Sequence, residues 1–305
     1  MSHTSESSTA DRRACTPSRS VTRGRCRSLI RKTVYERFRL VTAPARSLPY
    51  FVVIGAQKAG TSSLYAYLAK HPSVLPASRK EIHYFDSPAF AEGENWYRAH
   101  FPLDSVRKAL GIIRGAPVIT GEASPYYLTH PATPKRMYQL VPDAKLIVMV
   151  RNPVDRALSH YQHQFRKGRE SLSFGEAISA EEGRLAGERR RMVDDEYYYS
   201  RDYWGFSYLT RGRYAEQLEH WFSVFPPNQF LILDSEDFFR DPSTVYAQAL
   251  AFLGLPSHEL VRYERVNSGG EYSGMEPELR QRLSAYFEAP NRRFYELVGR
   301  DFGWE

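Results

Sequence analysis

The sequence predicts an α/β fold with a central, mostly parallel sheet flanked by helices. Four apolar runs have the length and composition of buried strands, at residues 50–55, 116–123, 144–153 and 229–238. Amphipathic segments lie between and after these runs, as expected when helices connect parallel strands. The segments predicted as helices are 62–71, 153–165, 213–225, 241–255 and 277–299.

The first strand leads into a turn that has the form of a phosphate-binding loop. Residues 54–64 read IGAQKAGTSSL, so an apolar strand, a glycine-containing turn and a helix follow one another. The loop of nucleoside triphosphatases, G-x-x-x-x-G-K-[ST], carries its lysine directly after the second glycine. In this chain Thr61 occupies that position, and Lys58 lies inside the loop. The loop therefore predicts a bound phosphate-like group that is held in a different way.

The third apolar run ends in a positive charge. Arg151 follows KLIVMV, where a nucleoside triphosphatase has an aspartate that holds magnesium. A residue at the carboxyl end of such a strand points into the crevice where open α/β sheets bind ligands, and arginine favours an anion there. Ser159 lies about two turns into the helix that begins near Pro153, so its hydroxyl can reach the same anion. We therefore expect two separate phosphate-like groups and no metal ion.

A basic tail precedes the predicted α/β domain. The whole chain of 305 residues has a net charge of +7, but residues 1–46 hold eleven Lys/Arg and only three Asp/Glu. Residues 47–305 then hold 31 basic and 32 acidic residues. We divide the chain into a largely disordered tail, 1–46, and one domain, 47–305, because the first 28 or so residues are rich in Ser, Thr and Arg and lack an apolar period.

The sequence allows several interpretations of the function of the tail. No stretch resembles a secretory signal or an apolar membrane span of about 18 residues. An Arg-rich leader with few acids is compatible with an organelle transit peptide, with electrostatic attachment to nucleic acid or anionic lipid, or with a solvated tail, which we favour. Both cysteines, Cys15 and Cys26, lie in the tail. The domain therefore has no disulfide and no cysteine nucleophile, which predicts a soluble, cytoplasmic protein.

Seven segments follow one another along the predicted domain: GAQKAGTSSLYAYLAKHP, KEIHYFD, GEASPYYL, LIVMVRNPVDRALSHYQH, RGRYAEQLEHWF, DPSTVYAQALAFLGL and NRRFYELVGRDFGW. Together they resemble sulfotransferases that use 3′-phosphoadenosine 5′-phosphosulfate (PAPS), in particular the heparan sulfate 3-O- and N-sulfotransferase branch. The resemblance runs from about Pro49 to Trp304.

The resemblance implies a set of residues that bind the sulfuryl donor. Lys58 would bond the 5′-phosphosulfate and help its bridging oxygen to leave, while Arg151 and Ser159 would bind the 3′-phosphate. The rest of the loop is implied as a binding surface, namely Ala59, Gly60, Thr61, Ser62 and Ser63. Backbone N–H groups at a helix N-terminus suit this role because they neutralise a phosphate. A late cofactor loop of the family, SKGR, is replaced here by NSGGEYSG, in which Ser268 and Gly269 are the candidates.

The resemblance also implies an acceptor site. Glu81 would be the general base, with His83 and Asp86 beside it. Glu122 follows the apolar residues 116–120, and from this place it is expected to orient either the acceptor or the loop. His83 has an alternative as a buried histidine bonded to backbone. Arg151 has an alternative as a structural ion pair with Asp155 or Glu122. Tyr126 and Tyr127 are expected in the core.

The acceptor itself stays open at this stage. Ala123 stands where the 3-O-sulfating relatives place a substrate-binding lysine. Residues 179–196, rich in glycine, arginine and acids, predict a surface excursion or a lid, and we expect the stretch 184–206 to select the acceptor.

We predict sulfuryl transfer from PAPS to a hydroxyl or amine, expected on a saccharide or a glycosylated small molecule. A P-loop kinase is the competing enzyme, but the lysine after the glycine and the magnesium aspartate are both missing. A non-catalytic nucleic-acid-binding module is the alternative from another class. The near-neutral charge of the domain and the lack of an aromatic-basic RNA motif argue against it, so no specific nucleic-acid partner is expected. The sequence leaves the oligomeric state open.

Overall fold

The computed structural model describes residues 34–195, 197–264, 266 and 275–304, and confirms the predicted α/β fold. Five strands form one sheet in the order β2-β3-β1-β4-β5, and every pair of neighbours is parallel. The strands are β1 (Phe51–Gly55), β2 (Val74–Pro76), β3 (Ile119–Ala123), β4 (Lys145–Val150) and β5 (Phe230–Asp234). Four of them lie within the apolar runs predicted as strands. β2 was missed because three residues ending in proline carry no strand pattern.

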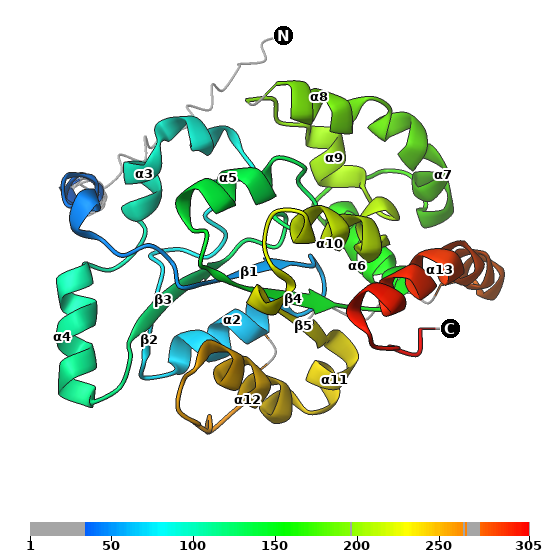
Figure 1. Cartoon of the computed structure of the whole chain (residues 1–305). Helices are drawn as coiled ribbons and strands as arrows, with labels where there is room; N and C mark the ends of the chain where they lie inside the picture. Colours follow the sequence, from blue (N-terminus) through cyan, green and yellow to red (C-terminus); the bar gives the residue numbers. More distant parts are fainter. Residues whose placement is uncertain (1–33, 196, 265, 267–274, 305) are drawn as a thin grey trace, which may run out of the picture.

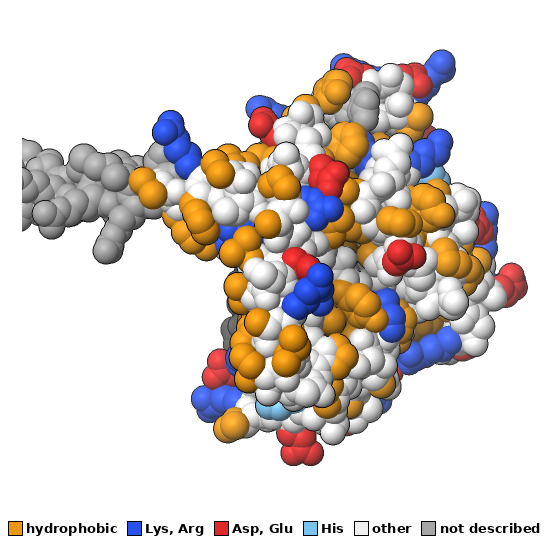
Figure 2. Space-filling view, turned by 60° about the vertical axis from the view of Figure 1, so that its left-hand side comes forward, with side chains coloured by type: hydrophobic (Ala, Val, Ile, Leu, Met, Phe, Trp, Pro, Cys, Tyr) orange, Lys and Arg blue, Asp and Glu red, His pale blue; other side chains and the backbone are white. Residues whose placement is uncertain are grey.

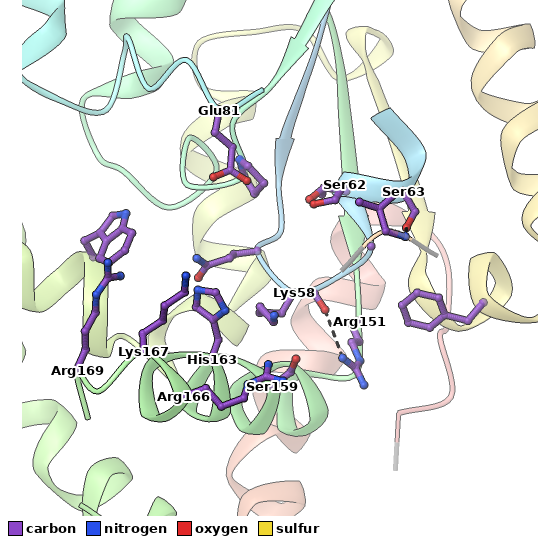
Figure 3. Close-up of a pocket in the computed structure, with 17 residues that line it drawn as sticks. Lys58, Ser62, Ser63, Glu81, Arg151, Ser159, His163, Arg166, Lys167 and Arg169 are labelled. Carbon is purple, nitrogen blue, oxygen red and sulfur yellow. Dashed lines mark hydrogen bonds between the residues drawn. The ribbon is translucent and has the colours of Figure 1, made fainter. Parts of the chain in front are cut away.

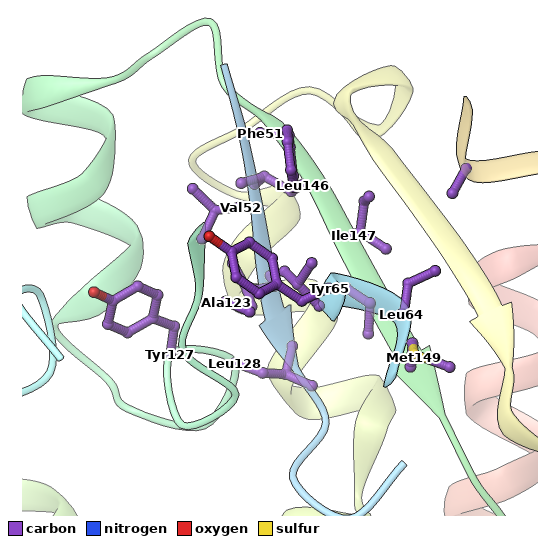
Figure 4. Packing of buried hydrophobic residues seen from close by; sticks show 14 of the residues in the cluster. Phe51, Val52, Leu64, Tyr65, Ala123, Tyr127, Leu128, Leu146, Ile147 and Met149 are labelled. Atoms are coloured by element: carbon purple, nitrogen blue, oxygen red, sulfur yellow. The ribbon is translucent and has the colours of Figure 1, made fainter. Parts of the chain in front are cut away.

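The two central strands are buried on both faces. Every residue of β1 is buried, as are five of the six residues of β4, so these strands are continuous apolar runs and not alternating ones. Figure 4 shows Leu64 and Tyr65 packed against the strands, close to Ile147 and Met149. The sheet is therefore a rigid base for the loops that leave its carboxyl edge.

Helices cover both faces of the sheet (Figure 1). One face carries α2, α11 and α12, and the other carries α5, α6, α10 and α13. The helices are α2 (Thr61–Lys70), α3 (Glu94–Arg98), α4 (Asp104–Arg114), α5 (Thr133–Leu140), α6 (Pro153–Arg166), α7 (Phe174–Leu185), α8 (Glu188–Asp194), α9 (Arg201–Phe206), α10 (Tyr214–Phe222), α11 (Ser235–Arg240), α12 (Pro242–Leu253) and α13 (Pro277–Val298). The five predicted helices correspond to α2, α6, α10, α12 and α13.

Two local sequences start the helices that flank the candidate site. Gly60 precedes α2 and has a φ of 94°. This conformation is unfavourable for any residue that has a Cβ atom. Asn152 caps α6, since its side chain accepts from the Val154 amide, and Pro153 occupies the first turn. As a result, α2 begins shortly after β1, and α6 begins shortly after β4.

The segment 34–46 packs against the domain. Residues 34–41 are helical and are followed by a 3₁₀ turn, Ala43–Ala45. Arg39 donates to the carbonyls of Ala99 and Phe101, and Arg46 donates to Phe101 at 2.6 Å. From the sequence, these two arginines are expected in a solvated basic tail. In the structure, both donate to backbone carbonyls that follow α3. The predicted boundary at residue 46 therefore falls inside an ordered segment, and residues 1–33 lie outside the described chain.

The predicted excursion at 179–196 is built from helices. α7 begins with a capping box, in which Ser173 and Glu176 bond each other's backbone amides. Met192 of α8 is buried against Tyr203 of α9 and against Tyr126, which follows β3, so a small separate core joins α8 and α9 to the segment after β3. Figure 1 shows α7, α8 and α9 together at one end of the molecule.

Candidate active site

A cavity of about 780 Å³ lies at the carboxyl ends of β1 and β4. This is the edge at which open α/β sheets bind ligands. Eight of the residues predicted from the sequence line it, and Figure 3 shows most of them facing a common space. They are Lys58, Gly60, Thr61, Ser62, Ser63, Glu81, Arg151 and Ser159.

The loop between β1 and α2 is shaped to receive an anion. No side chain in the described chain caps α2, and of its first amide groups that of Ser63 already donates to the Gly60 carbonyl at 3.0 Å, so the amides of Thr61 and Ser62 are the ones that can face an anion. Ala59 is fully buried, and its carbonyl accepts from Ser235 at 2.8 Å, which fixes the loop from behind. Ala59 therefore contributes to the site through the backbone, while its neighbours line the cavity.

Lys58 stands among several positive charges. Its backbone has a φ of 75°, in the left-handed region. Burial, as the largest cause, and the charges of Arg166, Arg151, Arg156 and Lys80, in that order, together lower the pKa of Lys58 to about 8. This group of cations creates a strongly positive potential, which an anionic ligand would relieve.

Arg151 lies against the loop and not in a structural ion pair. Its Nη1 donates to the Lys58 carbonyl at 3.3 Å, and its guanidinium lies 5.9 Å from the Phe239 ring centroid. Asp155 pairs with Arg280 at 2.6 Å, so the predicted alternative pairing with Asp155 is wrong. Arg151 Nε has no hydrogen-bond partner among the described residues, which leaves a buried donor for a ligand.

Ser159 lies on α6, two turns into the helix as predicted. Ser159 is only 4% exposed, and it lines the cavity on the same side as Arg151. The two residues can therefore donate to one anion.

Glu81, His83 and Asp86 form a chain of alternating charge. Glu81 Oε1 accepts from Lys80 Nζ at 2.9 Å, and His83 Nε2 lies 3.6 Å from Glu81 Oε2. His83 Nδ1 lies 2.8 Å from Asp86 Oδ2. Both Glu81 and His83 have positive φ values, 58° and 55°, so strained backbone holds the two side chains.

The charges in this chain shift the pKa of two groups in opposite directions. Contact with the His83 imidazole, together with the charge and hydrogen bond of Lys80, lowers the pKa of Glu81 to about 2, although burial opposes the shift. Burial by itself would lower the pKa of His83, but the Asp86 and Glu81 carboxylates raise it to about 10. Glu81 is therefore ionised and His83 is an imidazolium at neutral pH.

His83 lies beside Glu81, as expected, and Asp86 lies beside His83. His83 bridges two carboxylates, so the alternative of a buried histidine bonded to backbone is wrong. Asp86 is 1% exposed and does not line the cavity, so it reaches the site through His83 and does not contact an acceptor directly.

Of the two roles expected for Glu122, orienting the loop fits its position, whereas contact with an acceptor does not. Glu122 is fully buried, and its carboxylate accepts from Tyr97 and Ser124 at 2.7 Å and from Tyr127 at 3.0 Å. Burial raises the pKa of Glu122 despite these hydrogen bonds. Because its carboxylate already accepts from three hydroxyl groups, Glu122 stabilises the loop that contains His83 from the buried side. Ser124 in turn accepts from the His83 amide at 3.3 Å.

Sequence reasoning missed several cations of the cavity. Lys80 contacts both Ser62 and Glu81, and thus connects the phosphate loop with the predicted base. Arg166, Lys167 and Arg169 also line the cavity, beside Trp204. Arg166 lies seven residues after Ser159, and this helical spacing could have identified it, since residues two turns apart share one face.

The late segment enters the site next to α2. The Val266 amide donates to Ser63 Oγ at 2.9 Å, and Val266 lines the cavity. Ser268 and Gly269 lie outside the described residues. Within the described chain no three metal-ligating side chains come together.

Comparison with known proteins identifies the family. The model of the sulfotransferase domain family matches residues 48–269. The chain belongs to this sulfotransferase family. This sulfotransferase is 28% identical over 323 residues to the membrane-associated sulfotransferase kil1 of Dictyostelium discoideum, covering 85% of the chain and 67% of that relative. It is 30% identical over 291 residues to heparan sulfate glucosamine 3-O-sulfotransferase 6 of Homo sapiens, covering 87% of the chain and 76% of that relative.

A solved structure supports the same conclusion. The sulfotransferase from Alicyclobacillus acidocaldarius is 35% identical, with a TM-score of 0.63, over 84% of this chain and 98% of that one. The resemblance to heparan sulfate sulfotransferases is therefore confirmed. The comparisons therefore favour sulfuryl transfer over the two alternative hypotheses, the P-loop kinase and the nucleic-acid-binding module.

Proposed function

We propose that this sulfotransferase uses PAPS as its donor and transfers the sulfuryl group to a hydroxyl or amine of a saccharide-containing acceptor. The observation that carries the proposal is that Lys58, Arg151 and Glu81 line one cavity, with the two cations on the loop side and the carboxylate facing them (Figure 3). A donor with two anionic ends and an acceptor with a proton to lose match these three groups.

The loop and the arginine fit the donor. The uncapped first turn of α2 and the Lys58 ammonium would hold the 5′-phosphosulfate, and the free Nε–H of Arg151 with the Ser159 hydroxyl would hold the 3′-phosphate. When bound, PAPS supplies a sulfuryl group that is activated by its phosphoanhydride-like linkage. The fit needs no metal ion, because amide groups and cations of the chain neutralise the charges.

Lys58 has the acidity that the leaving group needs. An ammonium with a pKa of about 8 is protonated at neutral pH and still donates its hydrogen bonds readily. Its place inside the loop lets it follow charge that develops on the bridging oxygen as the bond to sulfur breaks.

Glu81 has the position and charge of the base. A carboxylate with a pKa of about 2 is a weak base towards a free alcohol. The hydroxyl proton becomes strongly acidic only as the oxygen–sulfur bond forms, so an ionised carboxylate held in place can then accept it. His83 and Lys80 fix the orientation of Glu81 and keep it charged.

The far side of the cavity offers a surface for a sugar ring. Arg169 lies 5.0 Å from the Trp204 ring centroid, and both residues line the cavity. An aromatic face beside cations suits a saccharide, and a related protein is named for its action on heparan sulfate glucosamine. Ala123 is buried and offers no charge, so the acceptor is selected by other residues.

Label transfer from PAPS carrying radioactive sulfate tests the proposal. The full chain is incubated with the labelled donor and an extract of its native cells, and the labelled product is treated with glycosidases. The expected result is a labelled product that glycosidases degrade. Label on an acceptor without sugar contradicts the acceptor class. If no fraction of the extract becomes labelled, the donor assignment is contradicted.

A further inference from the structure

Two short helices expose an unusual amount of apolar surface. Half of the large hydrophobic side chains that are exposed in the described part of the chain lie on the helix at 34–41 and on α4. We call this surface the docking face. Its residues are Val34, Tyr35, Phe38, Leu40, Val41, Val106, Ile112 and Ile113. Figure 2 shows exposed orange side chains, with blue ones among them, along the helix where the described chain begins.

α4 presents its apolar residues to the outside. In a helix that covers a core, apolar side chains face the core. No residue of α4 is buried, and Ile112 and Ile113 are 83% and 78% exposed. An amphipathic helix whose apolar side chains are left exposed by its own domain has the pattern of a helix that lies in an interface.

The two helices form one rigid face. Arg39 and Arg46 bind the carbonyl of Phe101, and Arg46 pairs with Leu103 in an isolated β-bridge just before α4. Ser47 donates to Asp104 at 3.1 Å, and Arg107 donates to Ser47 at 3.1 Å. Figure 1 shows both helices on the same edge of the molecule. A partner would therefore meet both helices together.

Positive charge accompanies the docking face. Residues 1–33, which lead into the helix at 34–41, hold eight Lys/Arg and two Asp/Glu. α4 adds Arg107, Lys108 and Arg114 against the single acid Asp104. The domain from residue 47 onward is close to neutral, so the net positive charge of the chain belongs to residues 1–46, the sequence that contains the helix at 34–41.

We propose that the docking face binds an anionic lipid surface, with both helices in the plane of the headgroups. Apolar side chains would insert into the boundary of the acyl chains, and the basic residues would contact the anionic headgroups. A nucleic acid would pair with the arginines but would leave Ile112 and Ile113 exposed to water. A second copy of the chain would bring two basic segments together. The inference does not depend on the acceptor or the donor.

Vesicle flotation of the full chain tests the inference. Vesicles of phosphatidylcholine alone are compared with vesicles that also contain phosphatidylserine. We expect binding only to the vesicles with phosphatidylserine, and weaker binding as salt is raised. The double variant Ile112→Glu/Ile113→Glu should weaken vesicle binding about tenfold or more, because it places two carboxylates at the inserted surface. Val193→Glu, an equally simple change at an exposed site on α8, should leave binding unchanged.

A second variant tests the other helix. Val34→Glu/Phe38→Glu should weaken vesicle binding to a similar extent, and both double variants should keep the wild-type melting temperature. The proposal is overturned if the chain binds no vesicle, if it binds neutral vesicles equally well, or if the double variants bind as wild type does. It is also overturned if light scattering shows a dimer that Ile112→Glu/Ile113→Glu dissociates.

Discussion

At the scale of single residues, the site depends on charges that shift one another. Lys58 is depressed in pKa by burial and by neighbouring cations, whereas His83 is raised by two carboxylates. Glu81 lies between Lys80 and His83 and stays ionised. The loop motif pointed to Lys58 and the family resemblance pointed to Glu81, but nothing in the sequence showed that Lys80 contacts both Glu81 and the loop residue Ser62.

The pKa of Lys58 predicts the alkaline limb of the pH profile. The ammonium form binds the donor, and it is lost as the pH rises through about 8, so kcat/KM for PAPS should fall above pH 8. Lys58→Arg keeps the charge to much higher pH and should remove that limb, although at a lower rate. A wild-type profile that stays flat well above pH 8 would contradict the assignment.

Glu81 and Glu122 are predicted to differ when each is changed to Gln. Glu81→Gln keeps the shape but removes the proton acceptor, so kcat should fall roughly 10²–10⁴-fold while the affinity for 3′,5′-bisphosphoadenosine stays near wild type. Glu122→Gln disturbs a buried cluster of hydroxyl donors, so it should cost about 1–3 kcal/mol of folding free energy.

Steady-state kinetics and thermal melting of the two variants separate these roles. Glu122→Gln is the matched control, because it makes the same chemical change at a buried glutamate that does not line the cavity. Near-normal turnover of Glu81→Gln would show that another group is the base.

At the scale of elements, the strand–loop–helix unit of β1 and α2 sets the position of the donor. Gly60 lies at the turn, where a Cβ atom would lie 3.2 Å from Phe238 and 3.3 Å from Met149. The sequence predicted the turn and both flanking elements. It did not predict that α11 packs behind the turn, because this contact joins residues far apart in the chain.

Gly60→Ala is expected to weaken both stability and donor binding. The left-handed backbone costs an alanine about 1–2 kcal/mol, and the close contacts add to that cost. Gly115→Ala is the control, since Gly115 also has a positive φ, 61°, but open space around it. Melting temperatures of the two variants should therefore differ, with Gly60→Ala the lower, and only Gly60→Ala should bind 3′,5′-bisphosphoadenosine more weakly. Equal melting temperatures would show that the contacts behind the turn are unimportant.

At the scale of the whole molecule, the sequence predicted the sheet and its family better than the surface. Central strands are long apolar runs and can be read directly, whereas β2 is too short to carry a pattern, and α4 was missed although its sequence is amphipathic. The helix at 34–41 was assigned to the tail, because the contacts of Arg39 and Arg46 with distant carbonyls are invisible in a charge count. A cytoplasmic location stays a prediction.

Removal of residues 1–28 should separate chemistry from docking. Every matching motif lies after Pro49, so turnover with a soluble acceptor should be unchanged. Binding to phosphatidylserine vesicles should weaken, since most of the basic residues of the tail are lost. A large loss of turnover in a folded truncated chain would contradict the division between tail and domain.

Calorimetric titration with 3′,5′-bisphosphoadenosine tests the central claim, that the cavity binds a PAPS donor through two anion sites. We predict that this ligand binds far more tightly than AMP or ATP, and that magnesium makes no difference. Arg151→Ala should reduce the affinity about tenfold to a hundredfold or more, because a charge-assisted contact contributes roughly 1.5–3 kcal/mol. Equal or tighter binding of ATP with magnesium, unaffected by Arg151→Ala, would contradict the account.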